Sequence, residues 1–160
     1  MRTALTVLLG STRSSSWATS AGLLVLRLGA GLLLITVFEK FIPRDGVWGP
    51  QQWFVDDVAK MGFPMPRAFA WAAVLSEFFG GMLLIVGLLA RPAAFFIAVT
   101  TFVAAFVYHQ QPLQQGLTAV IYFFMSISLM LAGPGRISLD ALLARRFLCA
   151  ISPTNTARHG

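Results

Sequence analysis

The sequence predicts an all-α protein, a membrane-embedded four-helix bundle with short interfacial helices in its first outer loop and after its last span. Of the 160 residues, 57% are hydrophobic and only 11% are charged, whereas about 25% of the residues in a soluble domain are charged. The mean hydropathy is +0.75. In addition, four apolar runs approach or reach the roughly 17–25 residues with which a helix crosses a bilayer.

Composition also excludes several classes of protein. The formal net charge is +6, but the basic residues are scattered between apolar runs instead of gathered on one face, so we expect no nucleic-acid partner. With Cys149 as the single cysteine, no intramolecular disulfide can form. Because the chain has no CxxC pair and no Cys/His cluster, we expect no metal site. The length suits one domain.

The predicted spans cover about residues 20–39, 68–90, 92–109 and 117–133, within a bundle domain at 19–135. Pro92 is well placed at a helix start, and the GPG sequence at 133–135 is a strong helix terminator. Residues 1–18 are predicted to be a mobile or interfacial tail, because their apolar part at 4–9 is short and a polar, serine-rich stretch follows it; a cleaved signal peptide is the alternative.

Loop charges predict that both termini are cytoplasmic, because cytoplasmic loops of membrane proteins carry an excess of Lys and Arg. The opposite side carries Lys and Arg offset by acidic residues in the first loop, and no Lys or Arg in the third loop. The arginines assigned to the inner side are Arg2, Arg13, Arg91, Arg136, Arg145, Arg146 and Arg158.

The first loop is predicted to contain a short amphipathic helix at the outer membrane surface. Its apolar residues Trp53, Phe54, Val58 and Met61 recur at near-helical spacing, which is typical of an interfacial helix. The alternative is an ordinary solvated loop.

Residues 136–160 are predicted to form a basic cytoplasmic interfacial helix and a disordered tail. The apolar positions of ISLDALLARRFLCAI place Arg145 and Arg146 where they reach anionic headgroups. Either Ser138 or Asp140 is expected to cap the start of this helix.

Two charges lie inside the predicted spans, Arg27 in the first and Glu77 in the second. An ion within a membrane is costly unless it is paired, so we expect these two side chains to contact each other. Small residues such as Gly80 and Gly81 share the face of Glu77 and let another helix approach closely. The pair either fixes helix register only or acts in proton transfer or ligand binding.

Polar residues also gather at the outer ends of the spans. Glu39, Lys40 and Arg67 form an interfacial network or extend individually to water. Tyr108 and His109 end the third span, where His109 is either a hydrated interfacial residue or a donor to a quinone carbonyl. Bis-histidine haem is excluded within one chain because the other histidine, His159, lies in the tail.

Several short motifs, taken in order, resemble the DoxX family of small four-span bacterial membrane proteins. They are the arginine in LRLGAGLLL, the lysine in EKF, the GFPMP turn, the carboxylate in SEFFGGMLLIVGLLAR, the YH pair, and GPGRISLD. Together they cover about residues 20–142. The chain departs from the family pattern at Thr36 and Val37, where members often carry His–Gly, and at Gln114 and Gln115, where an acidic residue is common.

The resemblance implies a bacterial inner-membrane protein that takes part in an oxidoreductase system. Some DoxX members resemble the small subunit of a thiosulfate:quinone oxidoreductase. By this resemblance, Arg27, Lys40, Glu77, Tyr108 and His109 are the site candidates. Glu77 would handle protons, with its pKa set by Arg27, while Lys40 or His109 would bond a headgroup or anionic substrate. The resemblance implies quinone as an exchangeable cofactor, and we expect no cofactor that is intrinsic to the chain.

Three functions remain open from the sequence. The first is a subunit or anchor of an oxidoreductase that binds quinone or a sulfur or thiol substrate. The second is a non-catalytic scaffold that recruits soluble partners, and the third is a small transporter, which would need a homo-oligomer. The chain has no GxSxG, Walker or GxGxxG motif in the required context, so no independent catalytic motif is present.

Overall fold

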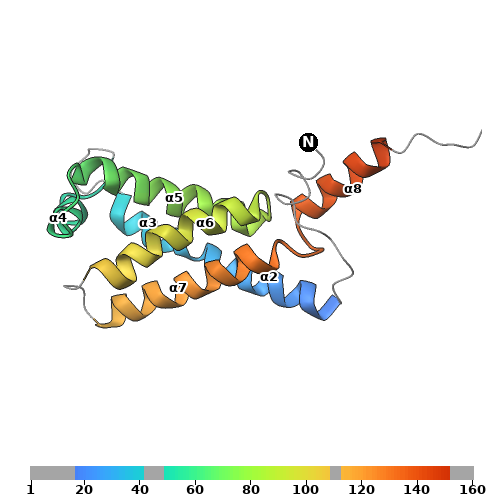
Figure 1. Ribbon diagram of the computed structural model, residues 1–160, viewed down its shortest axis with the longest axis horizontal. Coiled ribbons are helices and arrows are strands. Elements are labelled where there is room, and N and C mark those ends of the chain that lie inside the picture. Colours follow the sequence, from blue (N-terminus) through green and yellow to red (C-terminus); the bar gives the residue numbers. More distant parts are fainter. Residues whose placement is uncertain (1–16, 42–48, 109–112, 152–160) are drawn as a thin grey trace, which may run out of the picture.

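The computed structural model describes residues 17–41, 49–108 and 113–151, which are all-α with no strand among them (Figure 1). Side chains are described there except at 34–36, 39, 113–115 and 147–151. The helices are α2 Trp17–Gly31, α3 Leu33–Phe41, α4 Gln52–Lys60, α5 Pro66–Val86, α6 Ala90–Phe102, the π-helix η1 Val103–Val107, α7 Leu113–Ala132 and α8 Leu139–Ile151.

The long helices lie side by side along the long axis of the molecule (Figure 1). The neighbours α5 and α6, and likewise α6 and α7, pack against each other, while α2 contacts both α5 and α7. Helix α4 crosses one end, and α2 begins and α8 leaves at the other. We call the α4 end the outer end and the α8 end the inner end.

Within the described part of the chain, two helical segments are long and apolar enough to cross a membrane, Pro66–Val86 and Ala90–Val107. They match the second and third predicted spans. The fourth is represented by the shorter apolar stretch Gly116–Ala132. The first predicted span is not one helix, because a turn at Leu32 divides it into α2 and α3. The four-span assignment therefore stays a prediction.

Glycine explains both the break at Leu32 and the close packing beside it. Gly29 and Gly31 both lie within three residues before Leu32, and glycine costs about 1 kcal/mol relative to alanine inside a helix. At Gly31, helix α2 lies so near α5 that a Cβ atom would be 2.3 Å from Cγ1 of Ile85. The missing side chain thus permits a crossing that alanine would obstruct.

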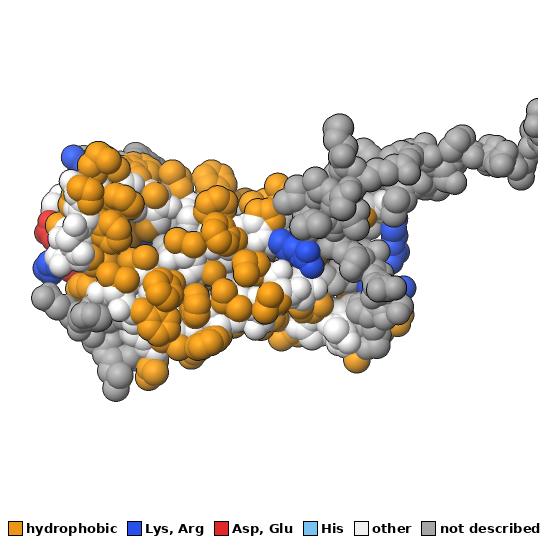
Figure 2. Space-filling model, viewed as in Figure 1, with side chains coloured by type: hydrophobic (Ala, Val, Ile, Leu, Met, Phe, Trp, Pro, Cys, Tyr) orange, Lys and Arg blue, Asp and Glu red, His pale blue; other side chains and the backbone are white. Residues whose placement is uncertain are grey.

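The surface between the two ends is strongly apolar, as Figure 2 shows, with charged side chains gathered toward the ends. Phe79 is 56% exposed and Phe124 is 59% exposed, which in water would be unfavourable. The buried core is small and built mostly from alanine and leucine. Its members are Ala30, Leu33, Leu84, Ala90, Ala93, Ala94, Ile97 and Leu129.

Local sequence signals account for several helix ends. Pro66 lies at the start of α5, and Gly87, with φ of 73°, ends it. There the amide of Leu88 donates to the carbonyl of Leu83 at 3.0 Å, as in a Schellman motif. Gly133, with φ of 81°, follows α7 as predicted. The helical character predicted for the regions of α4 and α8 is also confirmed.

The crossing at Gly31 predicts that Gly31→Ala destabilises the protein. The added methyl group overpacks the contact with Ile85, and overpacking costs about 1–3 kcal/mol. The matched control is Gly22→Ala on the same helix, where a Cβ atom meets nothing within 4 Å. Thermal unfolding in detergent should show a lower midpoint for Gly31→Ala and an unchanged or higher one for Gly22→Ala. Equal midpoints would contradict the proposed tight crossing.

Candidate functional site

Glu77 forms an ion pair with Lys40, near the outer end. The Lys40 Nζ atom lies 2.7 Å from Oε2 of Glu77. The Glu77 side chain is 4% exposed and that of Lys40 is 21% exposed, so the pair combines a buried carboxylate with an ammonium group that reaches toward water. The predicted contact between Arg27 and Glu77 is therefore wrong.

The geometry of the α2–α5 crossing explains why Arg27 and Glu77 lie apart. A Cβ atom on Gly31 would lie 3.4 Å from the carbonyl oxygen of Gly81, so these glycines mark the crossing. Arg27 precedes Gly31 by four residues and Glu77 precedes Gly81 by four, on helices that run in opposite directions. At ~1.5 Å per residue the two side chains start roughly 12 Å apart along the bundle.

Helix α4 covers the Lys40–Glu77 pair from the outer end. The ammonium of Lys40 lies 5.2 Å from the centre of the Phe54 ring, a favourable cation–π distance. The amide of Gln51, just before α4, donates to the carbonyl of Lys40 at 2.8 Å. The start of α4 is thus hydrogen-bonded to Lys40. Residues 42–48, which connect α3 to this part of the chain, lie outside the described residues.

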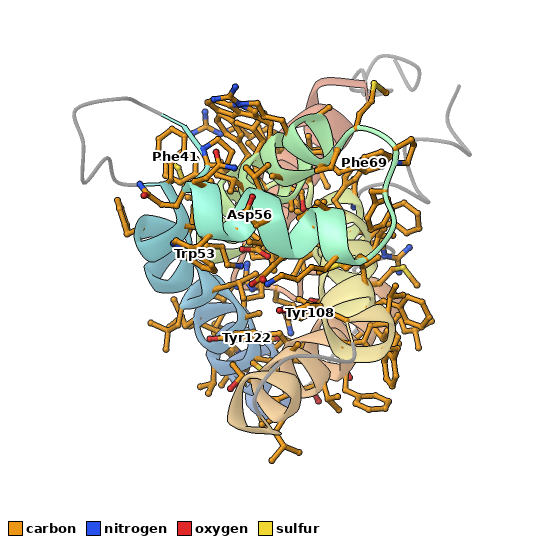
Figure 3. All side chains as sticks on the ribbon, turned by 90° about the vertical axis from the view of Figure 1, so that its left-hand side faces the viewer. Phe41, Trp53, Asp56, Phe69, Tyr108 and Tyr122 are labelled. Atoms are coloured by element: carbon orange, nitrogen blue, oxygen red, sulfur yellow. The ribbon has the colours of Figure 1, made fainter. Side chains whose placement is uncertain are left out.

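A second group of polar side chains lies at the same end. Lys60 donates to Oδ1 of Asp57 at 2.9 Å, and this hydrogen bond and charge raise the pKa of Lys60. The Tyr108 hydroxyl interacts with the same carboxylate, and Figure 3 shows Tyr108 beneath α4, seen from the outer end. The predicted site residue His109 and the side chain of Glu39 lie outside the described residues.

Arg27 lies at the inner end and is 1% exposed. Its Nη2 atom donates to the backbone carbonyl of Ile137, in the segment between α7 and α8. Gly87 makes room for the guanidinium, because a Cβ atom there would lie 1.8 Å from Nη1 of Arg27. Among the described residues, the Nε and Nη1 atoms of Arg27 have no hydrogen-bond partner.

Asp140 is fully buried beside Arg27 and fastens α8 to the turn between α5 and α6. Its carboxylate accepts hydrogen bonds from the amides of Leu89, at 2.9 Å, and Ala90, at 3.2 Å. Its own amide donates to the carbonyl of Gly87 at 3.0 Å. We call the set Arg27, Gly87, Ile137 and Asp140 the inner clasp.

The sequence left Ser138 and Asp140 open as the residue that caps the start of α8, and the structure shows that it is Ser138. The Oγ atom of Ser138 accepts a hydrogen bond from the amide of Ala141 at 3.1 Å, so Ser138 caps α8. Asp140 instead caps α6, which begins 50 residues earlier in the chain. Sequence spacing suggests local caps only, so this long-range cap could not be found from it.

The partner of Glu77 also differs from the one that the sequence predicts. Lys40 lies nine residues beyond Gly31, which places its Cα atom only about 7–8 Å further out than that of Glu77. A lysine side chain spans most of that distance, but the register depends on where the helices cross. The described residues contain no group of three or more His, Cys, Asp or Glu that could hold a metal ion. Of the candidates at the outer end, Lys40 and Tyr108 are described, and both carry groups that can donate to a headgroup oxygen.

Comparison with known proteins gives one family and one relative. The DoxX family pattern matches residues 22–110. The inner membrane protein YqjF of Escherichia coli (strain K12) is 31% identical over 132 residues, which is 79% of this chain and 95% of the relative. No solved structure matches. The family match includes Arg27, Lys40 and Glu77 but ends before Asp140.

A double-mutant cycle tests which residue is paired with Glu77. Lys40→Met leaves a buried carboxylate without a partner and should lower the free energy of unfolding by about 3–5 kcal/mol. Glu77→Gln should cost less, because Lys40 can extend to water. The combined variant removes both charges and should recover most of the loss from Lys40→Met.

The control cycle combines Arg27→Met with Glu77→Gln. Because these side chains do not share a contact, their effects on the free energy of unfolding should add. Reversible unfolding in detergent measures both cycles. Coupling in the Arg27 cycle, together with additivity in the Lys40 cycle, would show that the ion pair is assigned wrongly.

Proposed function

This chain belongs to the DoxX family, and from that premise we propose that it is a four-span inner-membrane protein serving as a subunit of a quinone-linked oxidoreductase system. The relative YqjF is an inner membrane protein, and the apolar exterior of this chain suits the same location. The observation that carries the proposed activity is the Lys40–Glu77 ion pair beneath α4.

Helix lengths support four spans. Helices α2 and α3 contain 15 and 9 residues with Leu32 between them, so together they extend roughly 37 Å at ~1.5 Å per residue. Helix α7 has 20 residues and extends about 30 Å. Both lengths suffice for a hydrocarbon core of about 30 Å. The broken first span is acceptable in a bilayer because the backbone amide at the break is satisfied: Leu32 donates to the carbonyl of Leu28 at 3.1 Å.

The distribution of charge supports cytoplasmic termini. The described arginines near α8, including Arg145 and Arg146, lie at the inner end with no exposed carboxylate among the residues described there. At the outer end, Lys60 is paired with Asp57 and Asp56 lies close by. An excess of arginine at one end favours the cytoplasmic side for that end.

The Lys40–Glu77 pair suits the binding of an oxygen-rich headgroup at the outer membrane surface. The partly exposed ammonium of Lys40 can donate to a quinone carbonyl or to an oxygen of a sulfur oxyanion, while Glu77 holds it in place. Phe54 offers an aromatic ring beside it. Tyr108 supplies a hydroxyl as a second donor at this end, and His109 stays a candidate from the sequence.

The proposed reaction needs a partner. Reduction of a quinone to a quinol takes up two electrons and two protons. A partner that oxidises thiosulfate or a thiol would supply the electrons, and protons would come from the outer aqueous phase through Lys40 and Glu77. Arg27 is too far from Glu77 to take part directly, so we propose a positioning role for it.

A non-catalytic scaffold is the second candidate function. It is favoured by α8, which projects from the inner end (Figure 1) and exposes Arg145 and Arg146. In a scaffold, the Lys40–Glu77 pair would serve stability alone. Removal of the charges of both Lys40 and Glu77 therefore distinguishes the two functions: it should lower turnover in an oxidoreductase subunit and leave turnover unchanged in a scaffold.

The combined variant Lys40→Met with Glu77→Gln should fold, yet lose at least tenfold in quinone-linked turnover, because it lacks the donor and the proton acceptor. The assay is thiosulfate-dependent or thiol-dependent reduction of a short-chain quinone in host membranes that contain only the variant. Asp56→Asn, on the exposed face of α4, is the matched control for carboxylate removal and should retain full turnover. Unchanged turnover in the combined variant would favour the scaffold.

Single cysteines should confirm the orientation. In a Cys149→Ser background, Asp56→Cys should react with a membrane-impermeant maleimide in intact cells whose outer membrane has been permeabilised. Arg145→Cys should react only after the inner membrane is opened, because we place α8 in the cytoplasm. Both native residues are exposed. The reverse pattern of labelling would invert the proposed topology.

A further inference from the structure

The charge exposed by α8 is positive only. Asp140 is the one acidic residue between Gly133 and Gly160, and it is fully buried, with its carboxylate accepting two backbone amides. Arg145 and Arg146 are exposed on the same helix. The single negative charge of this segment is therefore withdrawn from the surface, and the two arginines are not offset by any acidic neighbour on α8.

The two arginines share a face with an apolar side chain. Leu142 is 54% exposed and precedes Arg145 by three residues and Arg146 by four, which places all three on one side of the helix. A face that combines leucine with arginine suits the boundary between headgroups and acyl chains. We call Leu142, Arg145 and Arg146 the basic face.

The basic face lies close to the end of the bundle. Arg145 follows Leu139, the first residue of α8, by six positions, which corresponds to about 9 Å along the helix. The electrostatic influence of a charged membrane surface extends about 8–10 Å at physiological ionic strength. Whatever the tilt of α8, its arginines therefore remain within reach of headgroup charges at the inner end.

The inner clasp holds the start of α8 against the bundle. The carbonyl of Ile137 is held by Arg27, and the carboxylate and the amide of Asp140 both bond to the α5–α6 turn. Nearby, the guanidinium of Arg136 lies 5.6 Å from the Trp17 ring. The direction in which α8 leaves is thus set by contacts inside the bundle, not by a flexible linker.

We propose that the basic face of α8 binds acidic phospholipid headgroups of the cytoplasmic leaflet, and that the inner clasp holds α8 in position to do so. This proposal rests on the membrane placement proposed above, which the cysteine labelling tests independently. The charge of the basic face is complementary to that of an acidic headgroup. An acidic soluble protein would match the charge too, but the short distance to the bundle and the exposed leucine favour lipid.

The experiment uses the full chain reconstituted in nanodiscs, with a spin label at Ala144→Cys in a Cys149→Ser background. One set of discs contains phosphatidylcholine only, and the other contains about one third phosphatidylglycerol. We expect the label to be immobilised in the acidic discs and released by high salt. An arginine beside an acidic surface contributes roughly fivefold to binding, so Arg145→Gln with Arg146→Gln should lower the ratio of immobile to mobile label by about 25-fold.

Two further variants separate the parts of the proposal. Arg67→Gln removes an exposed arginine at the outer end and should leave the label unchanged. Asp140→Asn places an amide nitrogen opposite one of the two backbone donors, so the mobile fraction should rise even in acidic discs. Label mobility that is indifferent to lipid charge would overturn the proposal. Immobilisation of the label by soluble polyglutamate in place of acidic lipid would also overturn the proposal, because this would identify an acidic protein as the partner.

Discussion

The close crossing of α2 and α5 at Gly31 and Gly81 is the constraint on which the rest of the structure depends. It brings the backbones together where any Cβ atom on Gly31 would collide with Ile85. The crossing also determines the depth of every residue on the two helices, and so it separates Arg27 from Glu77. Each buried charge must then find its partner at its own end of the molecule, because a charge in a low-dielectric interior is unstable without one.

The two ends solve this problem in different ways. At the outer end, Glu77 is paired with a side chain of opposite charge, Lys40, that remains partly exposed. At the inner end, Arg27 donates to a backbone carbonyl, and Asp140 accepts from backbone amides. An ion pair open to water can exchange a proton or receive a ligand, whereas a charge enclosed by backbone groups mainly positions the chain. This contrast is why we propose chemistry at the outer end and mechanical attachment at the inner end.

Much of the fold could be predicted because its signals are local. Pro66 before α5, Gly133 after α7 and the periodicity of α4 and α8 depend on neighbouring residues only. The break at Leu32 was missed because an apolar run looks continuous whether or not its glycines permit a turn. The partners of Glu77 and Arg27 were assigned wrongly because charge pairing depends on the axial register of two helices, which a shift of two turns changes completely. Tertiary contacts decide that register, and no sequence spacing reports it.

The same reasoning changes what the charged motifs of this chain imply. A buried arginine in an apolar helix is often interpreted as functional, since its burial is costly. Here the cost is partly offset by the nearby charge of Asp140 and by a hydrogen bond to the segment that leads into α8, at a position where Gly87 has no side chain to obstruct the guanidinium. Replacing Gly87 by any residue with a Cβ atom would displace Arg27 and strain a backbone with φ of 73°. The glycine after α5, the arginine of α2 and the aspartate of α8 therefore act as one unit, although 113 residues separate the first of them in the chain from the last.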